Sequence, residues 1–83
     1  MYFLYILKCK DKSLYTGITT DLVRRLTEHS TTALGAKYTR ARRPVKLVYK
    51  KRFRTRSAAG REEARIKSLP RPEKLKLIQK VRR

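Results

Sequence analysis

The pattern of apolar and polar positions predicts three β-strands along the chain. Residues 2–9 (YFLYILKC) are mostly aromatic or aliphatic at both parities, which is typical of a strand covered on both faces. Residues 10–12 are turn-like and residues 13–19 resume the strand pattern, so we expect a β-hairpin. Residues 45–53 (VKLVYKKRF) alternate apolar and basic positions, and they predict the third strand.

Helix signals follow the hairpin. Thr20 and Asp21 offer side-chain oxygens to cap a first helix, which ends near Ser30. Its inner face is expected to carry three apolar residues, Leu22, Val23 and Leu26. Residues 31–44 show no period and contain a glycine and a proline as breakers, so we expect a loop there.

Two further helices are predicted after the third strand. Ser57 can cap one that runs to about Leu69 and stops before Pro70, and Pro72 suits the first turn of the last. The last helix repeats apolar residues at Leu75, Ile78 and Val81. The order β-β-α-β-α-α predicts an α/β (α+β) sandwich, in which helices flank a three-stranded antiparallel sheet.

Length and cysteine content limit the class of protein. The chain has 83 residues, which we interpret as one domain spanning 1–83. Cys9 is its single cysteine, so an intramolecular disulfide and a four-cysteine zinc site are excluded, and its apolar surroundings favour a core residue over a nucleophile. The first apolar run is too short to span a bilayer. We therefore expect a soluble protein of the cytoplasm or nucleoid.

Charge is the strongest compositional signal. The chain holds 24 Lys and Arg against 6 Asp and Glu, a formal net charge of +18. Such a balance favours counterion release from a phosphate backbone, so a nucleic-acid partner is expected. A ribosome-like basic protein fits the charge equally well. An anionic membrane is a weaker partner, because no long basic amphipathic helix is predicted.

Two tyrosines are predicted to share one face of the hairpin. A three-residue loop places Leu7 opposite Tyr15 and Tyr5 opposite Gly17, so the two tyrosines lie diagonal to each other. Gly17 removes the side chain opposite Tyr5, which marks either a bulge or a close approach by a ligand. The plainer alternative is two tyrosines that pack a core with their hydroxyls at its edge.

The first predicted helix carries two polar residues on the face next to the sheet. Arg25 and His29 are four residues apart and lie along one face, whereas Arg24 points elsewhere. Arg25 is expected near the tyrosines, where a guanidinium can clamp a phosphate. The alternatives are a solvated surface charge for Arg25 and a capping or packing role for His29.

A carboxylate interrupts the inward stripe of the second predicted helix. Ala59, Glu63 and Ile66 stand at i, i+4 and i+7. Glu63 could pair with an arginine or bind a hard cation such as Mg²⁺, which accepts one or two carboxylates with phosphate oxygens. Glu62 could take the inner face instead, because periodicity does not distinguish the two.

These residues together resemble the GIY-YIG nuclease domain. The likeness rests on Phe3-Leu4-Tyr5, on Tyr15-Thr16-Gly17 ten residues later, on Arg25 and His29, and on the glutamate in REEARIK. It runs over residues 2–78, and LYTGITTDLVRRLTEH is especially similar to the small single-domain bacterial members. Those members are related to the catalytic domain of a eukaryotic structure-specific endonuclease. The first motif reads FLY in place of GIY, and the late asparagine of some family nucleases is absent.

The resemblance implies hydrolysis of a DNA phosphodiester bond with one divalent ion, Mg²⁺ or Mn²⁺. It implies the following catalytic roles: Tyr15 as general base, Tyr5 orienting or sharing the proton relay, Arg25 steadying the phosphate, His29 assisting, and Glu63 holding the metal. Nucleic-acid contacts are expected from Gly17, Tyr38, Arg40, Arg42 and Arg43. Which tyrosine is the base stays open. Because an ordinary phenol has a pKa near 10, a tyrosine base needs a nearby cation.

Two functions are consistent with the sequence. The first is a metal-dependent endonuclease that acts on structured or single-stranded DNA in repair or recombination, with DNA preferred to RNA. The second is a non-catalytic basic module that binds nucleic acid in the same pocket. We expect a monomer and leave open a partner subunit.

Overall fold

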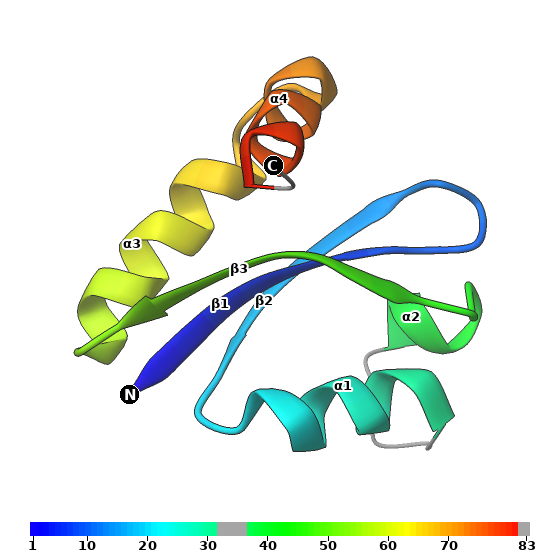
Figure 1. Ribbon diagram of the computed structural model, residues 1–83, viewed down its shortest axis with the longest axis horizontal. Helices are drawn as coiled ribbons and strands as arrows, with labels where there is room; N and C mark the ends of the chain where they lie inside the picture. Colours follow the sequence, from blue (N-terminus) through cyan, green and yellow to red (C-terminus); the bar gives the residue numbers. More distant parts are fainter. Residues whose placement is uncertain (32–36, 82–83) are drawn as a thin grey trace.

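The computed structural model describes residues 1–31 and 37–81, which form a three-stranded sheet with helices on both faces (Figure 1). The strands are β1 (Tyr2–Lys8), β2 (Leu14–Thr19) and β3 (Lys46–Phe53). The helices are α1 (Leu22–Thr31), α2 (Lys37–Arg40), α3 (Arg56–Lys67) and α4 (Arg71–Val81). Helices α1 and α2 lie on one face of the sheet, and α3 and α4 lie on the other. The predicted α+β architecture is confirmed.

Strand β1 is central because its side chains are apolar on both faces. The strand order is β2-β1-β3, and β1 pairs antiparallel with both neighbours. In the hairpin, Leu7 pairs with Tyr15 and Tyr5 pairs with Gly17, as the three-residue loop predicts. The register that places both tyrosines on one face is therefore confirmed.

The apolar core lies between the sheet and the helices α3 and α4. It is built from Leu4, Ile6, Tyr49, Ile66 and Ile78. Burying each aliphatic side chain of this size stabilises the fold by about 1.5–3 kcal/mol. Cys9 is a buried free thiol, in agreement with its predicted place in the core. This half of the molecule holds the sheet rigidly beneath the polar groups of the other face.

The opposite layer, under α1 and α2, combines apolar and polar side chains. Tyr5 and Leu7 enter it from β1, and His29 and Thr39 enter it from α1 and α2. All four are almost completely buried. Buried polar atoms need hydrogen-bond partners, and every such side-chain atom in the described residues has one. The polar part of this layer is therefore an organised network.

The caps that start α1 and α3 explain where each helix begins. The Asp21 carboxylate accepts the Arg24 N–H at 3.1 Å, so of the two candidate caps Asp21 starts α1. For α3 the predicted cap, Ser57, is wrong. The N-cap is Thr55, whose hydroxyl accepts the Ala58 N–H at 3.1 Å. Thr55 has the extended backbone that an N-cap requires, whereas Ser57 already lies inside the helix.

Two apolar residues expected in the core are exposed. Val23 is 77% exposed, because the side of α1 that faces the sheet is narrower than the apolar stripe predicted from the sequence. In α4, Leu75 is exposed while Leu77 and Ile78 pack against the core. The Val81 side chain lies outside the described residues.

Part of the predicted loop at 31–44 is helical. Helix α2 is a single turn within it, and one turn is too short to show an apolar period. Residues 32–36 lie outside the described residues. Of the helices in the described ranges, none is long and apolar enough to cross a membrane.

Candidate active site

Two tyrosines come together on the sheet face beneath α1 and α2. The ring centroids of Tyr5 on β1 and Tyr15 on β2 are 6.5 Å apart, so the diagonal arrangement expected from the register is present. Tyr5 is 1% exposed, whereas Tyr15 is partly exposed. The two phenols therefore occupy different environments, one internal and one in contact with solvent.

Gly17 provides the space that Tyr5 occupies. A Cβ atom on Gly17 would lie 2.5 Å from Oη of Tyr5 and 2.7 Å from its Cζ. The β1–β2 pairing is regular at this point, so a bulge is excluded. The group that comes close to this glycine is the protein's own Tyr5, and approach by a ligand stays a prediction. The predicted contact of Gly17 with nucleic acid stays a prediction.

His29 links Tyr5 to α2 through a buried chain of hydrogen bonds. Its Nε2 lies 2.8 Å from Oη of Tyr5, and its Nδ1 lies 2.7 Å from Oγ1 of Thr39. His29 and Thr39 are both completely buried. The imidazole thus fixes the Tyr5 hydroxyl by a hydrogen bond, while the tyrosine ring packs over Gly17.

Burial sets the charge of this imidazole. Desolvation, followed by the positive charge of Arg25, lowers the pKa of His29 from 6.5 to about 4. The ring is therefore neutral near pH 7. A neutral ring has one donor and one acceptor nitrogen, which matches two hydrogen bonds to hydroxyl groups.

Arg25 lies beside the buried phenol, as the helical spacing predicts. Its guanidinium donates to the Glu28 carboxylate, with Nη1 2.8 Å from Oε1, and it also hydrogen-bonds to Tyr5. Arg24, by contrast, has a side chain that is 71% exposed. The structure therefore separates the two adjacent arginines, and only Arg25 belongs to the tyrosine cluster.

The Tyr5 phenol is held in its neutral form. Burial raises the pKa of Tyr5 to about 12, and the hydrogen bond from Arg25 only partly offsets this. The negative charge of Glu63 raises the same pKa further. Arg25 and Glu63 thus act on one phenol from two different helices.

The structure distinguishes the two adjacent glutamates of α3. Glu62 forms two hydrogen bonds with Arg65, at 2.8 and 2.7 Å. Burial, and after it the negative charge of Glu62, raises the pKa of Tyr49 in the core layer. Glu63 acts on Tyr5 instead, and its carboxylate lies 3.3 Å from Nζ of Lys67. Both side chains of that ion pair are partly exposed. Glu63 is therefore the α3 carboxylate whose negative charge raises the pKa of Tyr5.

The donor chemistry of Glu63 fits a hard divalent ion. Residues 1–31 and 37–81 contain no cluster of three or more His, Cys, Asp or Glu side chains that would form a preformed metal site. Mg²⁺ keeps several waters and needs only one or two carboxylates together with substrate phosphate oxygens. A single partly exposed carboxylate such as that of Glu63 meets the protein's share of that requirement.

Tyr38 extends the aromatic cluster toward solvent. Its ring stacks on Tyr15 with centroids 5.9 Å apart and planes at 29°, and the Arg42 guanidinium lies 3.9 Å from its centroid. Arg42 is also bound to Asp11, with Nε 2.9 Å from Oδ2. Tyr38 therefore stacks on Tyr15, and Arg42 ties α2 to the hairpin loop. The predicted contacts of Tyr38 and Arg42 with nucleic acid stay predictions.

The other two basic residues of this segment differ in environment. Arg43 is half-buried and donates to the carbonyl oxygens of His29 at 2.6 Å and Glu28 at 3.0 Å, so it holds the end of α1. Arg40 is exposed on α2. Their predicted contacts with nucleic acid remain predictions, and Arg40 is the more accessible of the two.

Thr39 is the member of this cluster that the sequence pattern did not reveal. It lies in a stretch predicted as loop, where no periodicity marks a buried position. The available signal is its place directly after Tyr38, in a segment that the family resemblance had already associated with the substrate side.

Comparison with known proteins gives a family match and close relatives. Residues 1–76 match the family described as the GIY-YIG catalytic domain. UPF0213 protein OB0043 of Oceanobacillus iheyensis is 55% identical over 78 residues, which cover 94% of this chain and 90% of that protein. UPF0213 protein DP2720 of Desulfotalea psychrophila is 52% identical over 77 residues, covering 93% and 70% respectively.

Two solved structures share the fold. The solution NMR structure of UPF0213 protein BH0048 from Bacillus halodurans has 45% identity and a TM-score of 0.62, covering 95% of this chain and 84% of that one. The solution NMR structure of protein EF2693 from E. faecalis has 41% identity and a TM-score of 0.66, covering 98% and 85%. None of these names states an activity, so the chemistry of this chain has to be argued from its site.

Proposed function

The chain belongs to the GIY-YIG catalytic domain family, and on that premise we propose that it is a metal-dependent endonuclease that hydrolyses phosphodiester bonds in DNA. Its substrate class is structured or single-stranded DNA, in repair or recombination. One observation carries the proposal. Arg25 from α1 and Glu63 from α3 both act on Tyr5, beside the more exposed Tyr15, in a chain with only 6 acidic residues.

The two tyrosines have different proposed roles because they differ in exposure to solvent. Tyr15 reaches solvent and is positioned to take a proton from the attacking water as general base. Tyr5 is buried with a pKa near 12, so it stays protonated and orients the site through its hydrogen bond to His29. This assigns the general base to Tyr15 and the positioning role to Tyr5.

Arg25 and Glu63 handle the charge of the substrate. The Arg25 guanidinium can place two hydrogen bonds on the scissile phosphate while Glu28 keeps it aligned. Glu63 would hold Mg²⁺ or Mn²⁺, which supplies positive charge to the phosphate as its negative charge grows.

The adjacent glutamates of α3 provide the sharpest test. We expect the Glu63→Gln and Glu63→Ala variants to lose Mg²⁺-dependent cleavage of branched and single-stranded DNA while remaining folded by circular dichroism. The matched control is Glu62→Gln, which removes the same charge one residue away and should cleave like the parent. The endonuclease proposal fails if the Glu63 variants cleave as well as the parent.

The alternative is a module that binds nucleic acid without cutting it. The net charge of +18 favours it, as does the ion pair of Glu63 with Lys67. Its binding should weaken steeply with salt, with a slope set by the number of phosphates contacted. Mg²⁺-dependent turnover by the purified parent protein rules this alternative out.

A further inference from the structure

A second polar surface lies at the end of β2 that leads into α1. A pocket of about 270 Å³ is lined there by Tyr2, Ile18, Thr19, Thr20 and Arg56. Its volume is close to the lower limit of small-ligand sites, about 300 Å³, so it suits a single nucleotide unit. The start of β1, the end of β2 and the first residue of α3 all contribute to it.

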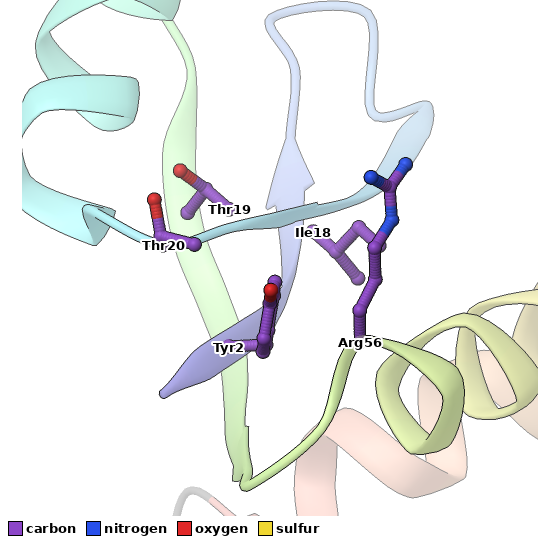
Figure 2. A pocket seen from close by; sticks show the side chains of 5 residues that line it. All are labelled: Tyr2, Ile18, Thr19, Thr20 and Arg56. Atoms are coloured by element: carbon purple, nitrogen blue, oxygen red, sulfur yellow. The ribbon is translucent and has the colours of Figure 1, made fainter.

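The groups around this pocket match the chemistry of a nucleotide. Figure 2 shows the Arg56 side chain rising from the start of α3 past Ile18 to β2, and the hydroxyls of Thr19 and Thr20 on the α1 side. Arg56 is exposed and forms no ion pair or side-chain hydrogen bond with the rest of the described chain. A guanidinium can bind a phosphate through two hydrogen bonds, and a phenol ring such as that of Tyr2 can stack on a base.

The pocket adjoins the proposed catalytic groups along two elements. On β2, Ile18 directly follows Gly17, the residue paired with Tyr5. On α3, Arg56 precedes Glu63 by seven residues, or two turns, so both project from the same side of the helix about 10 Å apart along its axis. Because β2 is an edge strand, no other strand lies outside it.

We propose that this pocket is a subsite for a nucleotide that flanks the scissile phosphate. Arg56 contacts a phosphate of that nucleotide and Tyr2 contacts its base, so the substrate strand runs along the outer edge of β2 from Arg25 toward the start of α3. The identity of the ligand as the substrate strand rests on the proposed endonuclease function.

Binding measurements on the full chain test the subsite without requiring cleavage. The probe is a short fluorescein-labelled oligothymidylate, followed by fluorescence anisotropy in the absence of divalent metal. Arg56→Gln should weaken binding about tenfold, the value of one charged hydrogen-bonded contact, and lower the salt slope by about 0.7. The matched control is Arg61→Gln, which removes the same charge from an exposed residue of α3 that bonds to Ser57. It should weaken binding less than about twofold.

NMR titration shows where on the protein the oligonucleotide binds. On addition of the same oligonucleotide, the backbone amides of Ile18, Thr19 and Thr20 should shift in the parent chain, and in Arg56→Gln they should need about ten times more oligonucleotide to shift equally. A Tyr2→Leu variant keeps the apolar contact and should lose the stacking part of the affinity. Equal binding by the Arg56 and Arg61 variants, or unshifted β2 amides in the parent, would overturn the subsite.

Cleavage kinetics separate the two proposals. If both hold, Arg56→Gln raises KM for single-stranded DNA and leaves kcat close to the parent value. A parent that binds the probe in the pocket and never cleaves overturns the endonuclease function while the nucleotide site stands. A parent that cleaves, with an Arg56 variant identical to the Arg61 control, overturns the subsite alone.

Discussion

The hydroxyl of Tyr5 lies 2.8 Å from Nε2 of His29, and this contact joins the central strand to α1. Both side chains are buried, so the hydroxyl hydrogen has no solvent acceptor and is donated to Nε2. The single hydrogen of the neutral ring is then on Nδ1, which donates to Oγ1 of Thr39 at 2.7 Å. Three buried groups thereby fix the position of one tyrosine.

Acid is expected to weaken the fold through His29. Its pKa is about 4 in the folded chain and 6.5 when unfolded, so between these values the unfolded state binds more protons. The stabilisation is complete above pH 6.5 and is lost as the pH falls toward 4, by at most about 3 kcal/mol. Urea unfolding at pH 7 and pH 5 measures the loss.

The same titration can be followed directly, because the chain has one histidine. The ring signals of His29 in NMR spectra should stay constant from pH 8 to pH 5. A midpoint near 6.5 would contradict the buried neutral imidazole.

The two tyrosines should respond differently to loss of the hydroxyl. Tyr5→Phe removes the hydroxyl that hydrogen-bonds to Nε2 of His29 and should lower the free energy of unfolding by about 1–3 kcal/mol. Tyr15→Phe should change it by less than about 0.5 kcal/mol but reduce the cleavage rate by about 10²–10⁴-fold. Urea unfolding and single-turnover cleavage measure both effects. A Tyr15→Phe protein that cleaves as fast as the parent would show that Tyr15 is not the general base.

The glycines of β2 and α3 form a matched pair for the same substitution. Gly17→Ala places a methyl group 2.5 Å from Oη of Tyr5, so the ring must move, at a cost of about 1–3 kcal/mol. Gly60→Ala meets no atom within 4 Å and should stabilise α3 by up to about 1 kcal/mol. Thermal unfolding should therefore shift in opposite directions. A neutral Gly17→Ala would show that Tyr5 does not need the space.

Thr39 is expected to act as a positioning residue for His29. Thr39→Val keeps the shape but removes the Oγ1 acceptor, which should destabilise the fold by about 1–3 kcal/mol and shift the ring toward the Nε2-protonated tautomer. The ¹⁵N shifts of the imidazole report the tautomer. Thr39→Ser retains the hydroxyl and should keep the parent spectrum, and an unchanged spectrum in Thr39→Val would refute the role.

The sheet could be predicted because its determinants are local. Loop length alone set the hairpin register that pairs Tyr5 with Gly17, and apolar residues at both parities marked β1 as the strand with two covered faces. Helical spacing likewise placed Arg25 on the sheet side and Arg24 outside. Such patterns depend on neighbours within a few positions along the chain.

The remaining features depend on contacts between distant residues. His29 and Thr39 are ten residues apart in the chain and are joined by a hydrogen bond that no repeat of apolar residues predicts. Helix α2, which carries Thr39, is too short to show a helical repeat. Periodicity could not distinguish Glu62 from Glu63, and each of them has a cation within about one helical turn, Arg65 or Lys67. Only the docking of α3 on the sheet decides between them.

The central position of β1 also determines when the site can be complete. In chain order, β2 is the first partner available to β1, and the other edge of β1 can be paired only once residues 46–53 have been made. Glu63 comes later still in the chain. Both tyrosines, Arg25 and His29 therefore precede the last strand in the chain, whereas the carboxylate of the proposed site follows it.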